Sequence, residues 1–75
     1  MTDNILEIAA TALNITREEA LRCHKLLSEV DAYYFWNPSR GGRTMIINKA
    51  GERLIASAAV KFEDHLKTFM SGRRN

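Results

Sequence analysis

Cysteine and proline are almost absent from this chain, each occurring once, and no apolar run approaches the ~20 residues that cross a membrane. The single Cys23 has no partner for an internal disulfide, which excludes the cysteine-rich scaffolds of small secreted domains. No basic segment followed by an apolar run marks a secretion signal at the start. We therefore expect a cytoplasmic protein that makes no use of a membrane.

The chain also lacks an excess of charge of either sign, because 11 basic and 9 acidic residues leave a formal net charge of +2. Such a small charge attracts polyanions weakly, so a nucleic-acid site would need local clustering of basic side chains. Apolar residues make up 45% of the composition, which is ordinary for a folded protein. With 75 residues we expect one small domain, 1–75.

Residues that carry out reactions are scarce as well. Two histidines and one cysteine do not have the spacing of a zinc motif. Cys23 and His24 are adjacent, and neighbours in a helix point about 100° apart, so they do not face each other as nucleophile and base. The paired carboxylates at 18–19 and 63–64 lie near expected helix starts, where the helix dipole favours them. His65 is expected to be a packed histidine or one at the rim of the core. We predict no catalytic residue, no metal site and no cofactor, and so no enzyme.

What the sequence does contain is a series of helix and turn signals. Apolar side chains recur at helical spacing from Ile5 to Leu13. Side-chain oxygens at positions 2–4 can cap the first turn, and Asn14 suits the left-handed conformation that ends many helices. These signals predict a first helix over residues 4–13.

A second helix is expected to begin immediately after the first. Thr16 and Glu19 have the spacing of a capping box, in which each side chain binds the backbone amide of the other residue. Apolar residues continue at helical spacing as far as Val30. We predict a second helix over residues 17–30, with Cys23 on its buried side.

The densest signals of the chain follow. Four consecutive aromatics at 33–36 precede Asn-Pro and Gly-Gly turn signals, and residues that favour an extended backbone come after them. This pattern predicts an antiparallel hairpin whose basic tip carries Arg40 and Arg43. Because side chains alternate along a strand, Tyr34 and Trp36 share one face and the other two aromatics share the opposite face.

The segment after the hairpin allows two interpretations. Asn48 and Gly51 have the spacing of a type I turn with a glycine bulge, which makes residues 53–57 a third strand of a meander. Alternatively, Asn48 caps one long helix, because apolar residues continue at helical spacing beyond it. We favour the meander, since two strands alone are marginal and Gly51 would weaken a helix by about 1 kcal/mol. Both interpretations include a final helix over 59–71.

Residues 5–30, with two helices separated by Leu-Asn-Ile-Thr, resemble a helix-turn-helix, and the basic hairpin after them resembles the wing of winged-helix DNA-binding domains. This resemblance implies one long C-terminal helix after the wing and contacts of Arg40 and Arg43 with nucleic acid. Glu18 and Glu19, however, place negative charge at the start of the second helix, where base contacts would form.

We therefore predict an α+β fold with two N-terminal helices, a short antiparallel meander or hairpin, and a C-terminal helix; the alternative is winged-helix-like. The expected function is that of a small regulatory or adaptor protein that binds a protein partner, or a second copy of itself, through residues 32–47. Aromatic and arginine side chains are enriched where binding energy concentrates, so the candidate binding residues are Tyr34, Trp36, Arg40 and Arg43. The alternative function is nucleic-acid binding through both arginines and the second helix.

Overall fold

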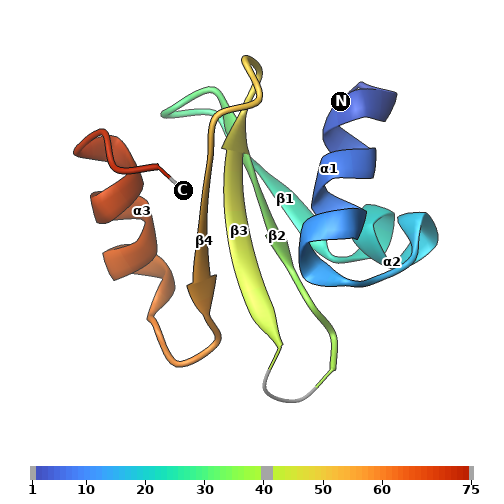
Figure 1. Ribbon diagram of the computed structural model, residues 1–75. Helices are drawn as coiled ribbons and strands as arrows, with labels where there is room; N and C mark the ends of the chain where they lie inside the picture. The colour runs from blue at the N-terminus through green and yellow to red at the C-terminus, as the bar shows by residue number, and fades with distance from the viewer. Residues whose placement is uncertain (1, 40–41, 75) are drawn as a thin grey trace.

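The computed structural model describes residues 2–39 and 42–74 and has the expected α+β fold (Figure 1). Its elements in chain order are α1 (Asp3–Leu13), α2 (Arg17–Arg22), β1 (His24–Leu27), β2 (Ala32–Trp36), β3 (Arg43–Asn48), β4 (Arg53–Ser57) and α3 (Phe62–Met70). The strands form an antiparallel sheet in the order β1-β2-β3-β4. As Figure 1 shows, α1 and α2 lie on one side of this sheet and α3 lies on the other.

The first helix begins and ends where its local signals predict. The Oγ1 atom of Thr2 accepts a hydrogen bond from the amide of Ile5 at 3.2 Å. Asn14 has a φ of 55°, and its amide donates to carbonyls of the last helical turn. Both ends depend on bonds to residues at most four positions away, so the prediction over 4–13 is confirmed with one added residue at the start.

The predicted second helix over 17–30 is wrong beyond its first turns. The capping box is present, because the Glu19 amide donates to Thr16 Oγ1 at 3.0 Å and the Thr16 amide donates to Glu19 Oε1 at 2.9 Å. The helix nevertheless ends after 6 residues, and the chain turns into β1. Cys23 therefore lies half-buried at the end of α2 instead of on a buried helical stripe.

The helix ends early because β2 needs a neighbouring strand on its outer side. Without β1, the amides and carbonyls on that side of an apolar, aromatic strand would have no backbone partner. β1 supplies one, with Lys25 opposite Tyr34 and Leu27 opposite Ala32. The sheet consequently has four strands, one more than the predicted meander.

The turn after β3 has the predicted chemistry. Asn48 Oδ1 accepts from the amides of Ala50 and Glu52, both at 3.0 Å, and Gly51 adopts a φ of 88°. β4 follows this turn, so the meander is confirmed and the long C-terminal helix of the winged-helix alternative is wrong. The final helix is shorter than the predicted 59–71, because its first residue is Phe62.

Each face of the sheet has its own apolar core. The alternation of side chains along β3 sends Met45 and Ile47 toward α1 and Ile46 toward α3. The buried residues on the α1 side are Ile5, Leu6, Ala9, Ala10, Leu13, Ala20, Phe35, Met45 and Ile47. Those on the α3 side are Leu27, Ala32, Ile46, Leu54 and Phe69.

A buried histidine joins α3 to the sheet. His65 is 1% exposed, its Nε2 lies 2.8 Å from the carbonyl oxygen of Leu54, and its Nδ1 lies 3.1 Å from Thr44 Oγ1. A carbonyl only accepts, so Nε2 carries the proton and donates, which leaves Nδ1 to accept from the threonine hydroxyl in the neutral ring. Of the two predicted alternatives, a packed or a rim histidine, the structure shows the packed one, and the ring connects α3 with β3 and β4.

Candidate partner-binding surface

The structure separates the residues that the sequence predicts as one binding site. Trp36 pairs with Thr44 and Tyr34 with Ile46, which places both aromatics on the α3 side of the sheet. Arg43 shares its face with Met45, on the α1 side. Arg40 lies outside the described residues. The shared face of Tyr34 and Trp36 is confirmed, but Arg43 does not join them.

Asn37 fixes the base of the hairpin against the first helix. Its side-chain Nδ2 donates to the carbonyl of Leu13 at 2.9 Å, and its backbone amide donates to the carbonyl of Arg43 at 3.1 Å. Gly42 is required beside it, because a Cβ there would lie 2.4 Å from the Cβ of Asn37. These contacts hold Trp36 and Arg43 at the same end of the sheet.

On the α3 side, four side chains form a surface that we call the aromatic surface: Lys25, Tyr34, Trp36 and Phe62. The rings of Tyr34 and Trp36 have their centroids 5.8 Å apart, and Phe62 meets Tyr34 edge to face at 4.8 Å. Lys25 Nζ lies 4.0 Å from the centroid of Phe62 and 5.7 Å from that of Tyr34. The three aromatic residues are half-buried, so each presents part of its ring to solvent.

Trp36 is the member of this surface that the fold uses least. Its backbone is bound, since its amide donates to the carbonyl of Cys23 at 3.1 Å. Its side chain, in contrast, belongs to neither core cluster of residues 2–39 and 42–74, and within the same residues its indole nitrogen makes no hydrogen bond. The indole is therefore a half-exposed apolar group with an available donor.

Sequence reasoning missed Lys25 and Phe62. The sequence pattern places Lys25 inside the predicted second helix, and its position opposite Tyr34, nine residues along the chain, depends on the pairing of β1 with β2. Phe62 reaches Tyr34 only because α3 packs against this face of the sheet. No local pattern in four residues of β1 distinguishes a short edge strand from the end of an amphipathic helix.

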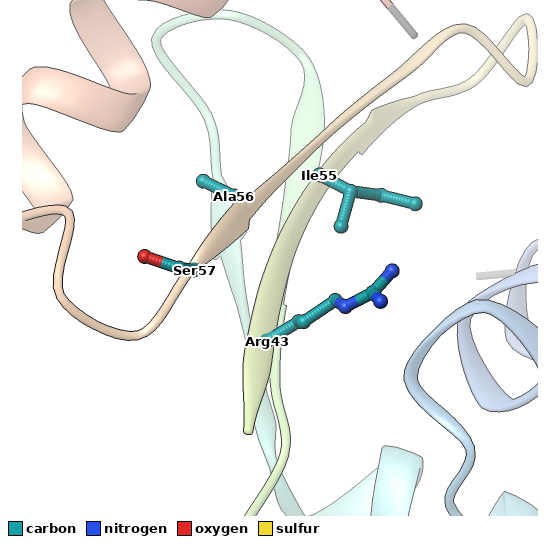
Figure 2. Close-up of a pocket in the computed structure, with 4 residues that line it drawn as sticks. All are labelled: Arg43, Ile55, Ala56 and Ser57. Carbon is teal, nitrogen blue, oxygen red and sulfur yellow. The ribbon is translucent and has the colours of Figure 1, made fainter. Parts of the chain in front are cut away.

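Arg43 belongs to a different feature, a groove that follows β4 on the α1 side. Figure 2 shows its guanidinium beside the Ile55 side chain, while Ala56 points to the opposite side of the sheet. Arg43, Ile55, Ala56 and Ser57 line one end, with a volume of about 300 Å³. The other end, of about 320 Å³, is lined by Glu7, Ile8, Thr11, Ala12, Arg53 and Ile55. We call the two hollows together the arginine groove.

Ionic contacts of the described residues lie mostly away from both surfaces. Lys49 Nζ is 2.9 Å from Asp31 Oδ1, and this hydrogen bond and charge raise the pKa of Lys49 above 10.5. In the part of the chain that the structure describes, no three histidine, cysteine or acidic side chains are grouped so as to hold a metal ion. The helices of that same part include none that is both long and apolar enough to cross a membrane.

No protein-family model, curated protein or solved structure is significantly similar to this chain. Its function is therefore argued from the two surfaces themselves.

Proposed function

We propose that this chain is a small non-enzymatic adaptor or regulatory domain that binds a protein partner through the aromatic surface. The observation that supports this proposal is the Trp36 side chain, half-exposed beside Tyr34 with an unused indole donor. The binding element is the α3 side of the hairpin over residues 32–47. A second copy of the chain is the alternative partner, and the experiment below separates the two.

The physical argument concerns what these side chains gain from a partner. A tryptophan or tyrosine already fixed by its strand loses little conformational freedom on binding and still has apolar area to bury. Lys25, held over Phe62 and Tyr34, adds a cation at the margin, where it can meet a carboxylate or a carbonyl of the partner. Truncation of such an anchor commonly costs at least about 2 kcal/mol of binding free energy, or roughly 30-fold in affinity.

The non-enzymatic part of the proposal is supported by how the candidate reactive groups are used. Both ring nitrogens of His65 are bonded in the core. His24 Nδ1 lies 2.7 Å from the carbonyl oxygen of Leu21, and its ring stacks on Phe35 at 5.5 Å. With the lone Cys23, which suits a reducing compartment, we propose a cytoplasmic setting for this binding activity.

The experiment compares Trp36→Ala and Tyr34→Ala with a matched control, Tyr33→Ala. Tyr33 is half-buried like Tyr34 and adjacent to it, but it lies on the α1 side of the sheet. Immobilised wild-type and variant proteins are used to capture partners, which are identified by quantitative mass spectrometry. Affinity for the purified partner is then measured by calorimetry, after circular dichroism has shown that each variant is folded.

We expect both aromatic-surface variants to weaken binding at least about 30-fold and Tyr33→Ala to leave it within about threefold of wild type. If Trp36→Ala and Tyr34→Ala bound the purified partner as tightly as wild type does, the proposal would be contradicted. Sedimentation at increasing concentration shows whether the partner is a second copy. Titration with duplex and single-stranded DNA tests the nucleic-acid alternative, which requires affinity that falls steeply with salt.

A further inference from the structure

The arginine groove has a regular arrangement of charge and apolar surface. Arg53 and Ile55 lie two residues apart on β4 and share the α1 side of the sheet, and Ser57 continues the same spacing. Arg43 is the cross-strand partner of Ser57. One face therefore presents an arginine, an isoleucine and a second arginine; the backbone positions of the two arginines are about 14 Å apart along the strand direction, and the Arg43 side chain extends toward Ile55 (Figure 2).

The two arginines carry positive charge that the described residues do not neutralise. Within residues 2–39 and 42–74, neither Arg43 nor Arg53 forms an ion pair with a carboxylate. Arg53 Nη1 donates to the carbonyl of Gly51 at 3.3 Å, which leaves its other N–H groups for a ligand. The acidic side chain of the groove wall, Glu7, has its Oε2 3.6 Å from Arg17 Nη1 and so already has a cationic partner.

The floor between these charges is apolar and has a wall on one side. Ile8 and Ala12 of α1 and Ile55 of β4 are all half-buried, so the groove leaves part of each accessible. A ligand that fits needs an apolar group for this floor and an anionic group at each end. Guanidinium groups bind carboxylates through paired hydrogen bonds, which a single ammonium cannot make.

We infer that the arginine groove binds an extended acidic segment of a partner protein, with the pattern carboxylate–x–apolar–x–carboxylate. In an extended chain, side chains two residues apart point the same way and rise about 6.8 Å, so positions i, i+2 and i+4 match the backbone spacing of Arg53, Ile55 and Arg43, the cross-strand partner of Ser57. This surface lies on the opposite side of the sheet from the aromatic surface. The inference therefore does not depend on the proposed function, and it adds a second binding surface to the protein.

The probe is the acetylated, amidated heptapeptide Gly-Glu-Ser-Leu-Ser-Glu-Gly, titrated at low salt into ¹⁵N-labelled full chain. We expect amide shifts to change at Ile8, Ala12 and Ile55 and to saturate. Replacing both glutamates of the peptide by glutamine should abolish the response. Moving them to adjacent positions, with the same charge, should weaken it about fivefold, because only one arginine can then be reached.

Variants of the protein test the same geometry. Arg43→Gln and Arg53→Gln should each weaken peptide binding about fivefold, and Glu7→Gln should strengthen it about twofold, because a carboxylate of the wall is removed. The matched control Arg73→Gln, an exposed arginine after α3, should leave binding unchanged. Trp36→Ala should also leave it unchanged, so failure of the aromatic surface and failure of the groove are distinguishable.

Three outcomes would overturn the inference. The first is an absence of shift changes at millimolar peptide, and the second is equal binding of the glutamine peptide. The third is a single-stranded oligonucleotide that causes the same shifts with much steeper salt dependence, which would assign the groove to nucleic acid.

Discussion

Replacing His65 by leucine should destabilise the domain severely, although leucine is apolar and of similar size. The imidazole is 1% exposed and bridges the carbonyl of Leu54, at 2.8 Å, and the hydroxyl of Thr44, at 3.1 Å. In His65→Leu, the Thr44 hydroxyl would remain inside the protein without a partner, since Thr44 is 7% exposed, whereas the Leu54 carbonyl would lose one donor and keep the amide of Ile46 opposite it in the ladder between β3 and β4. The loss therefore includes the desolvation of the Thr44 hydroxyl as well as two hydrogen bonds.

The magnitude follows from the number of groups left unpaired. The buried Thr44 hydroxyl without a partner costs about 1–3 kcal/mol and the lost hydrogen bond to Leu54 about 0.5–1.5 kcal/mol, so His65→Leu should lower the free energy of unfolding by about 1.5–4.5 kcal/mol. A domain of 75 residues has a total stability of only about 4–11 kcal/mol. Thr44→Val leaves one ring nitrogen unpaired and should lower the free energy of unfolding by about 1–3 kcal/mol.

The double variant isolates the shared hydrogen bond. Once His65 is leucine, the Thr44 hydroxyl has already lost its partner, so adding Thr44→Val removes an unsatisfied group and should cost little. The two single losses should therefore exceed the loss in the double variant by at least about 1 kcal/mol. Additive losses would show that Thr44 and His65 do not interact.

Urea unfolding is the suitable assay, because Trp36 is the single tryptophan and reports through its fluorescence. A matched control is Lys67→Leu, the same new residue at an exposed position of α3, which should change stability by at most about 0.5 kcal/mol. In a thermal scan, each kcal/mol should lower Tm by about 4–8 °C. A His65→Leu variant as stable as this control would refute the reasoning.

Two further predictions concern the turns at the other end of the sheet. Gly51 has a φ of 88°, and a Cβ built there has no atom within 4 Å. In urea unfolding, Gly51→Ala should therefore lower the free energy of unfolding by about 1–2 kcal/mol through backbone strain alone, and Gly51→Asn should lower it less. Equal stability of the wild type and both variants would contradict the left-handed turn. The hydrogen bond that Lys49 donates to Asp31 raises the pKa of Lys49 above 10.5, so the folded state holds this proton more tightly: the contribution is complete below that pH and is lost as the pH rises through the higher folded value. Unfolding midpoints between roughly pH 10 and 12 should accordingly fall further for wild type than for Lys49→Met, and identical slopes would argue against the pair.

The binding residues illustrate how far sequence reasoning reaches. That Tyr34 and Trp36 share a face follows from strand alternation alone, and the structure confirms it. That Arg43 lies on the opposite face depends on the register between β2 and β3, which the contacts of Asn37 with Arg43 and Gly42 hold and no periodicity reveals. A shift of one residue would have reversed its side.

The sequence by itself determined the features whose bonds close within about four residues: the Thr2 cap and Asn14 end of α1, the Thr16 capping box, and the turn from Asn48 to Gly51. Such signals need no distant partner, so composition and spacing are sufficient to recognise them. Only the tertiary structure decided that α2 ends early and that β1 completes the sheet. There, a short segment compatible with either helix or strand adopts the state in which the next strand, β2, satisfies its backbone hydrogen bonds, a pairing that no signal within the segment itself reveals.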